Sequence, residues 1–451
     1  MTCELRASTR IPYLDPEEGR LRGVPAPIRV LPLSGTERGQ GERSSIFGRA
    51  RKLGFLGVLA FLLLACGRPH EKPAAEGQSW QQIEQQARGK KVRMMMWKGD
   101  PQINAYMENW VKPRLEAERG VELEISSGQG NTLVTLLMGE IEAKQERSAI
   151  DLVWINGETF YQLRQIGALY GPFTDRLPNA EFIDFSNRFI ALDFQQPIAG
   201  YECPWGNVQL ALIYDSARMP EPPRSREALA AWIKAHPGRF TFDSSFTGMT
   251  FLKSLLADFG GGSSSLDGPF DEEKYRRHSA ELWAWLLELK PFLWKRGETF
   301  PAGVAQLHQL FASGEIDFSM SNNDGEVDAK ILQGVFPETA RAFVLDGGTI
   351  QNSHYLGIPR LSPNVAAALV AIDFLISPAA QLEKLDPRVW GDGTVLAAEK
   401  LPAEWREKFE KVPQRRFAPK RAEIAGKAIA EPDAQYMIRI FDDFRKNVIE
   451  R

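Results

Sequence analysis

The sequence VRMMMWKGDP, residues 92–101, joins an apolar run to a turn and to the start of a helix. Val92–Trp97 is a short apolar run bounded by turn residues, which predicts a buried strand. Gly99 lies in the predicted turn, and Pro101 favours the first helical position, where its missing N–H is not needed. An amphipathic helix over Ile103–Glu118 completes a strand–turn–helix unit.

The same unit follows twice more along the chain. Val121–Ser126 alternates apolar and polar residues, as a strand does, and a helix is predicted over Leu133–Lys144. Ile150–Ile155 is a third predicted strand, followed by a helix over Phe160–Ile166. Strands that alternate with helices indicate βαβ units and a mostly parallel sheet, so the predicted fold class is α/β.

A second set of elements follows, and it has the same character. Its predicted strands are Val208–Asp215, Arg239–Asp243, Ile316–Ser321, Phe343–Asp346 and Ser353–Ile358. Its predicted helices are Arg226–Ala235, Met249–Ala257, Ala280–Leu293, Ala305–Ser313, Gly325–Leu332 and Asn364–Ile376. The tail, residues 401–451, is charged and is predicted to be helical. The chain is therefore expected to hold two α/β lobes followed by C-terminal helices.

The most apolar stretch of the chain is Leu53–Ala65, with 13 residues. A transmembrane helix needs about 20 apolar residues, and the glycines at positions 54 and 57 weaken a buried core helix. Basic residues at positions 49, 51 and 52 precede the stretch, as they do in a secretion signal. We therefore predict a secretion signal here.

The residues around this signal suggest how the mature protein begins. LLACG, residues 63–67, resembles the bacterial lipobox, so residues 53–66 are predicted to form a lipoprotein signal with Cys66 as the lipidated residue. The alternative is an ordinary cleavage site that holds a cysteine by chance. Residues 67–89 are predicted to form a linker and a short helix, Trp80–Ala87. Because signal n-regions are short, residues 1–52 are interpreted as an upstream extension, and we hypothesise that translation starts near Val30 or later, at a non-Met codon.

Composition is that of an ordinary globular body. The chain is 43% apolar and 25% charged with a formal net charge of −3, and nothing in it suggests a nucleic-acid partner. The cysteines are Cys3, Cys66 and Cys203, so Cys203 is left without a pairing partner in the mature protein.

No catalytic or metal-binding motif stands out in the sequence. The five histidines lack the spacing of HExxH or of a zinc site, and there is no phosphate-binding loop and no GxSxG. We therefore expect no metal, no cofactor and no enzyme activity.

A recurring feature is a small polar cluster between a strand and the next helix. Such clusters occur at residues 97–100, 128–132, 156–159, 243–247 and 321–324. Ligands of open α/β sheets bind outside the carboxyl ends of the strands, where helix N-termini offer free N–H groups. Helix capping alone explains any one cluster, but five of them in two lobes favour a shared ligand cleft.

Four segments resemble those of a known family. Leu369–Glu383, LVAIDFLISPAAQLE, is similar to the apolar helix and Ser-Pro turn of extracellular solute-binding proteins of ABC importers. Leu310–Ser321 and Asn207–Pro220 resemble the helix–Gly–strand step and the interlobe strand of that family. Val389–Trp405 is similar to the YnjB-like subgroup of periplasmic components.

This resemblance implies a two-lobed, type II periplasmic binding protein fold with two interlobe crossings. The crossings are expected near Tyr201–Leu212 and Leu345–Gly357. Residues 90–205 and 346–400 would form the first lobe, and residues 206–345 the second. The implied partners are a small solute, the ABC permease in the inner membrane and the membrane itself, through the lipid anchor; the protein is expected to be a monomer.

The polar loops and their aromatic neighbours give the candidate ligand contacts. They are Trp97, Gly130, Asn131, Thr132, Asn156, Glu158, Trp205, Ser245, Phe246, Thr247, Asn322, Asn323, Asp324 and Tyr355. Trp154 is interpreted as a core residue. Aromatic faces and carboxylates favour a small polar solute that is cationic or aromatic, and the subgroup implies one that is thiamine-like. The alternative function is an envelope lipoprotein that acts as an enzyme or a scaffold, with carboxylates in the interlobe cleft.

Overall fold

A computed structural model describes residues 13–14, 21–22, 77–413 and 415–450. The chain divides into two compact units, Met1–Pro69 and His70–Arg451. In the first unit, β1 (Tyr13–Leu14) pairs antiparallel with β2 (Leu21–Arg22). The predicted signal, Cys66 and residues 67–76 of the linker lie outside the described residues.

The first lobe is built around the predicted parallel strands. β3 (Lys90–Met96) lies between β4 (Val121–Ser127) and β5 (Leu152–Ile155) and pairs in parallel with both. Val92, Met94 and Met96 are fully buried, because alternate residues of β3 point to the same face. β12 (Thr349–Gly357) extends the sheet by pairing antiparallel with β5.

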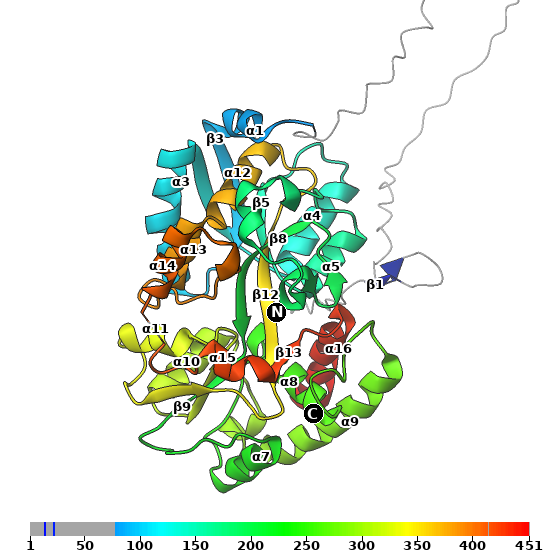
Figure 1. The fold of residues 1–451 in the computed structure, drawn as a ribbon. Coiled ribbons are helices and arrows are strands. Elements are labelled where there is room, and N and C mark those ends of the chain that lie inside the picture. The colour runs from blue at the N-terminus through cyan, green and yellow to red at the C-terminus, as the bar shows by residue number, and fades with distance from the viewer. Residues whose placement is uncertain (1–12, 15–20, 23–76, 414, 451) are drawn as a thin grey trace, which may run out of the picture. The chain divides into compact units, whose positions relative to one another are not determined.

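Helices cover both faces of this sheet (Figure 1). α1 (Trp80–Ala87) packs on α12 (Val365–Leu375), which lies on β3, and α4 (Asn131–Glu142) packs with α5 (Glu158–Gln165). The helix predicted over residues 103–118 is α2 (Pro101–Ala105), a π-helical segment (Tyr106–Val111) and α3 (Lys112–Arg119) in succession. Pro113 has no N–H to donate to the preceding turn, and the π-helical segment lies just before it.

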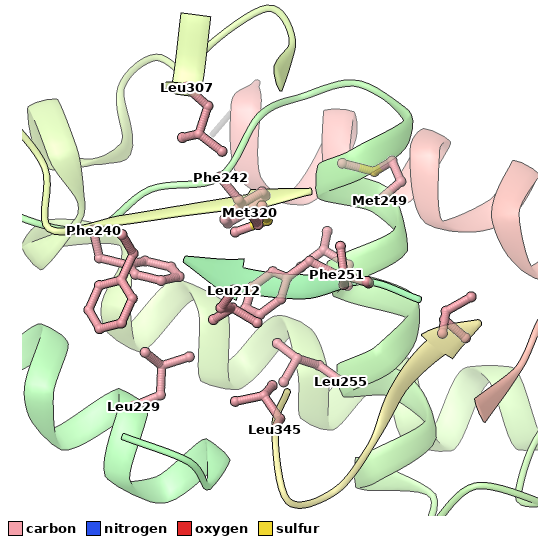
Figure 2. Packing of buried hydrophobic residues seen from close by; sticks show 14 of the residues in the cluster. Leu212, Leu229, Phe240, Phe242, Met249, Phe251, Leu255, Leu307, Met320 and Leu345 are labelled. Carbon is pink, nitrogen blue, oxygen red and sulfur yellow. The ribbon is translucent and has the colours of Figure 1, made fainter. Parts of the chain in front are cut away.

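The second lobe has a smaller, antiparallel sheet. β9 (Ala211–Asp215) lies between β10 (Phe318–Ser321) and β11 (Ala340–Phe343). Its helices are α7 (Arg226–Ala235), α8 (Phe246–Phe259), α9 (Glu272–Leu289), α10 (Val304–Ala312) and α11 (Glu326–Leu332). Figure 2 shows apolar side chains of α7, α8 and α10 around Leu212 and Met320 of the sheet.

The strand predicted over Arg239–Asp243 is wrong. This segment is an irregular stretch whose carbonyls accept from two loops: Trp294 donates to Phe240, and Asp317 donates to Arg239. Phe240 and Phe242 are buried in the core (Figure 2), so their alternation reflects packing of an irregular segment and not a ladder.

Two long strands join the lobes, as the sequence predicts. β8 (Glu202–Gln209) leaves the first lobe and continues through Leu210 into β9, and β12 returns antiparallel beside it (Figure 1). Their register shifts where His354 pairs with Gly206 but Tyr355 pairs with Pro204. Trp205 is therefore the extra residue of a β-bulge, which bends the strand pair.

A third connection between the lobes is an addition to the predicted ones. α13 (Pro378–Leu385) and α14 (Ala403–Glu410) pack together beside the first lobe. Residues 411–420, which we call the strap and of which residue 414 is not described, then lead to the second lobe, where the Phe417 carbonyl accepts from Ala342 of β11.

The chain beyond the strap packs on both the interlobe strands and the second lobe. α15 (Arg421–Ile424) leads to β13 (Ala428–Ala430), which pairs in parallel with β12. α16 (Ala434–Phe444) packs against α8 and α5, and its apolar side chains join the second-lobe core. The smaller elements are α6 (Arg188–Ala191), β6 (Leu192–Asp193), β7 (Gln196–Pro197), the 3-10 turns Thr174–Arg176, Pro178–Phe182, Lys290–Phe292, Trp294–Gly297, Ala398–Lys400 and Ala425–Lys427, and the π-helical turn Arg445–Ile449.

Across the described part of the chain, no single helix is long and apolar enough to cross a membrane. α12 and α13 meet the criteria of length and composition only as a pair, and they are bent by 54° at the break between them. The α12 side chains are buried in the first-lobe core.

Candidate functional site

A pocket of about 490 Å³ lies between the two lobes. Its walls are the carboxyl ends of the strands and the first turns of the helices that follow, which is where open α/β sheets bind ligands. A volume of this size suits a small-molecule ligand.

The first-lobe wall comes from three strand–helix junctions. Trp97 follows β3, Gly130 precedes α4, and Asn156 and Glu158 lie between β5 and the first turn of α5. Gly157 has a φ of 53°, and a side chain there would overlap the Phe194 ring. Glycine therefore allows the turn that places Asn156 and Glu158 at the pocket.

The second-lobe wall repeats this arrangement. Ser245, Phe246 and Thr247 start α8, and Asn322 and Asn323 follow β10. The Asn322 amide donates to the Thr247 hydroxyl at 3.1 Å, which joins the two loops. α11 adds Glu326 and Lys330, and Gln333 directly follows this helix.

Aromatic rings form the part of the pocket nearest the interlobe strands. Trp154 lines the pocket and meets Trp97 edge to face, with ring centroids 6.5 Å apart. Trp390 lies 5.9 Å from Trp154 and is stacked on His354 of β12. Gly206 leaves room for His354, because a side chain at position 206 would overlap the imidazole.

Two direct contacts join the lobes at the pocket. Lys330 Nζ of the second lobe lies 2.5 Å from Asp100 Oδ2 of the first, and the side chains are only 8% and 12% exposed. The Asn323 amide donates to the carbonyl of Gly391 at 3.2 Å. The two lobes are therefore in contact beside the pocket, as in a closed form.

Several buried polar atoms that belong to pocket residues have no hydrogen-bond partner among the described residues. Three are acceptors: Glu158 Oε2, Gln102 Oε1 and Asn322 Oδ1. One is a donor, Gln333 Nε2, and the fifth atom is His354 Nε2, which lies 3.1 Å from Asp392 Oδ2. Because buried polar groups are normally paired, this set favours a ligand that donates more hydrogen bonds than it accepts.

Glu158 has an unusual electrostatic environment. Burial raises its pKa to about 7, against a backbone hydrogen bond and the nearby Lys253 charge, which lower it, and together with the Glu431 charge, which raises it. Lys253 Nζ is itself engaged by Glu431 Oε2 at 2.5 Å. Burial also raises the pKa values of Glu431 and Asp193.

The other acidic groups of the pocket are already neutralised. Burial alone would raise the pKa of Glu326, but His308 and Lys330 outweigh it and lower the pKa to about 2. Asp392 behaves likewise, because His354 and Lys384 outweigh its burial and bring its pKa to about 2. Glu158 differs from them, since it forms no ion pair within the described part of the chain.

The pocket brings together nine of the fourteen predicted ligand contacts. They are Trp97, Gly130, Asn156, Glu158, Ser245, Phe246, Thr247, Asn322 and Asn323. Contact of these residues with a ligand stays a prediction. Trp154, interpreted from the sequence as core, also lines the pocket while packing against Trp205.

The other five predicted contacts do not line the pocket. Trp205 and Tyr355 are 0% exposed, and the Tyr355 hydroxyl donates to the Ile190 carbonyl at 3.1 Å. Asp324 is bound by Arg415 and Arg421 and accepts from the Gln209 N–H. Asn131 and Thr132 are exposed in the first turn of α4. We therefore remove these five from the candidate site.

Sequence reasoning missed several lining residues. Trp390, His354, Lys330 and Glu326 all lie at the pocket. A helix position that faces the other lobe has no local sequence signal. His354 lies within the strand predicted over Ser353–Ile358, but that prediction does not say which of its side chains reach the pocket. Within the described residues, no group of three or more His, Cys, Asp or Glu is arranged to hold a metal ion.

Two α/β lobes that close on a pocket between them, joined by crossing strands, define a periplasmic solute-binding protein. The chain belongs to the family of bacterial extracellular solute-binding proteins, whose family model matches residues 109–412. It is a substrate-binding component of an ABC transporter, a class that binds small solutes and interacts with a membrane permease.

Individual relatives agree with this assignment. The chain is 34% identical to Protein YnjB of Escherichia coli (strain K12) over 346 residues, which is 76% of this chain and 89% of that protein. The resemblance to the YnjB-like subgroup is thereby confirmed.

Solved structures confirm the two-lobed periplasmic binding fold. The Tp0655 (TpPotD) lipoprotein of Treponema pallidum matches with a TM-score of 0.58 and 15% identity, covering 80% of this chain and all of that one. A putative spermidine/putrescine ABC transporter from Listeria monocytogenes matches with a TM-score of 0.55 and 17% identity, covering 79% and 98%.

Proposed function

We propose that this protein captures a small cationic solute with a flat aromatic group, of the thiamine type, and delivers it to the permease of its ABC importer. One observation carries the proposal. Glu158 Oε2 is buried, lacks a hydrogen-bond partner among the described residues, and belongs to a pocket lined by tryptophans.

The hydrogen-bonding groups support a positively charged solute. A buried carboxylate without a partner is costly, and a cation beside Glu158 removes that cost. The amide oxygens of Gln102 and Asn322 accept further N–H groups. The Gln333 amide supplies one donor, which suits a ligand that also carries an acceptor, as an aminopyrimidine does.

The aromatic side chains of the pocket support a solute that is flat or cationic. Trp97 and Trp154 meet at right angles, so they present a ring face and a ring edge side by side. A cation over a tryptophan face gains about 0.5–2 kcal/mol, and a flat ring packs against the same surface.

Calorimetry with thiamine tests the proposal. Choline is the comparison for a cation without an aromatic ring, and nicotinamide is the comparison for a neutral aromatic ring. We expect thiamine to bind more tightly than either. Glu158→Gln should weaken thiamine binding about tenfold to a hundredfold, because it removes a charged hydrogen bond. Glu202→Gln is the matched control, since Glu202 is a buried carboxyl away from the pocket.

Two results would overturn the proposal. One is the finding, by native mass spectrometry of the protein purified from cells, that the solute retained in the protein is an anion. The other is steady chemical conversion of the solute, which would indicate an enzyme.

We also propose that the mature protein begins at Cys66, carries lipid there and works as a monomer at the periplasmic face of the envelope. The LLACG sequence supports this anchor. Palmitate labelling should be lost in Cys66→Ser, and a variant that still incorporated label would refute the anchor.

A further inference from the structure

A buried group of charges lies where the two lobes and the interlobe strands meet. Glu158 comes from α5 and Asp193 from β6 in the first lobe, and Lys253 comes from α8 in the second. Glu431 follows β13. In Figure 1, α8 and β13 both lie beside β12.

The group contains one lysine for three carboxyl groups. Lys253 and Glu431 form an ion pair at 2.5 Å, with side chains 0% and 4% exposed, and the Asn352 amide donates to the second Glu431 oxygen at 2.8 Å. Asp193 accepts the Gly157 N–H at 2.6 Å. Lys253 is thus paired with Glu431, and the buried Oε2 of Glu158 has no hydrogen-bond partner within the described residues.

The remaining charged groups of the pocket do not compensate Glu158. Lys330 is held by Asp100 and Glu326, and His354 and Lys384 are held by Asp392. A buried carboxyl in this position favours its neutral, protonated form, because burial penalises the charged form.

We infer that Glu158 gives up its proton when a cationic solute binds, so that solute capture is coupled to proton release. This inference rests on the proposed function. The neutral carboxylic acid of Glu158 loses H⁺ to a water molecule and becomes a carboxylate, and the solute cation replaces the lost positive charge. No covalent bond of the solute is changed.

Two further observations support this coupling. Burial raises the pKa of Glu158 to about 7, which places its protonation near neutral pH in the absence of solute. A recess of about 10 Å³ lies behind the charge group, lined by Asp193, Asn352, Glu431 and the partly exposed Arg188. A recess of this size holds about one water molecule, and Asn352 lines both it and the main pocket.

The expected pH dependence follows from linkage. With a pKa of about 7 before binding and a low one after it, about 0.9 proton is released per solute at pH 6 and about 0.1 at pH 8. Binding should therefore be about tenfold weaker at pH 6 than at pH 8.

Calorimetry in two buffers of different ionisation enthalpy measures the protons released when thiamine binds. For the unaltered protein we expect release that falls between pH 6 and pH 8. In Glu158→Gln the release and the pH dependence should both vanish. In Glu202→Gln both should persist, because burial raises the pKa of Glu202 as well but this residue does not line the pocket.

The two proposals fail in different ways. Thiamine that binds equally tightly at pH 6 and pH 8 without proton release overturns the coupling and leaves the proposed function standing. Absence of thiamine binding at every pH overturns the proposed function.

A solute-free titration then tests Glu158 directly. The ¹³C carboxyl resonance assigned by its loss in Glu158→Gln should titrate near pH 7, and titration near the ordinary value for glutamate would overturn the coupling.

Discussion

Tryptophans in this protein have different roles that depend on where each one lies along its strand. Trp97 comes directly after β3 and is partly exposed at the pocket, whereas Trp205 lies in the β-bulge of β8 and is 0% exposed. Trp154 packs edge to face against both. The sequence shows that each residue is aromatic, but only the packing separates a pocket wall from the core behind it.

Trp97→Ala should therefore weaken binding with little effect on folding. We expect a loss of about 1–2 kcal/mol in the binding of thiamine, roughly tenfold in Kd, measured by calorimetry. Trp205→Ala is the control and should instead lower the free energy of unfolding by about 3–5 kcal/mol. Unchanged thiamine affinity in folded Trp97→Ala would remove Trp97 from the site.

Much of the candidate site is predictable because its residues follow predicted strands. Asn156 and Asn322 each lie one residue beyond a strand, where a polar residue faces the sheet edge. Lys330 and Trp390 cannot be predicted as pocket residues in this way, because neither follows a predicted strand. Their place at the pocket depends on how the lobes close and on where the chain returns after α13.

At the level of elements, local patterns predict the first-lobe strands and most helices. The alternation of strands and helices predicts a mostly parallel sheet, which is wrong for the second lobe, where β9 pairs antiparallel with β10 and β11. Alternation along the chain does not fix the direction of neighbouring strands. Arg239–Asp243 imitated a strand, since two buried phenylalanines two residues apart also suit an irregular core segment. The strap has no periodic pattern, and it is held by side-chain contacts instead.

Asp328 of α11 holds the strap to the second lobe. Its carboxylate accepts the backbone N–H groups of Arg416, Phe417 and Ala418, at 2.7, 3.1 and 2.9 Å. Asp328→Asn replaces one acceptor oxygen by a donor that faces these N–H groups. We expect a loss of about 1–3 kcal/mol in the free energy of unfolding and faster hydrogen exchange at residues 415–424.

Asp346→Asn is the control for this experiment, because the Asp346 carboxylate forms an exposed ion pair with Lys427. It should change the free energy of unfolding by less than about 1 kcal/mol. Equal exchange in the strap of Asp328→Asn and of the unaltered protein would contradict the assigned role of Asp328.

At the scale of the whole molecule, closure of the lobes involves the ion pair between Asp100 and Lys330. Asp100 also caps α2, because its carboxylate accepts the N–H groups of Gln102 and Ile103. Lys330 does not cap a helix. The lysine is therefore the better residue to alter when the contact between the lobes is tested.

Lys330→Met should favour an open form in the absence of solute. It removes the cation that joins the lobes and leaves Asp100 and Glu326 facing each other as like charges. We expect a larger radius of gyration in small-angle scattering than for the unaltered protein. Lys408→Met, which removes an exposed ion pair with Glu404 and a contact with the Trp405 ring on α14, is the control. Identical scattering curves for Lys330→Met and the unaltered protein would show that this pair does not hold the lobes together.

The strap has a mechanical consequence. If two adjacent strands were the only connection, one lobe could both bend and twist relative to the other. A further tether attached to α11 opposes the twist and leaves the bending (Figure 1). The pocket walls then approach along nearly one path, so the halves of the site arrive in register each time they meet.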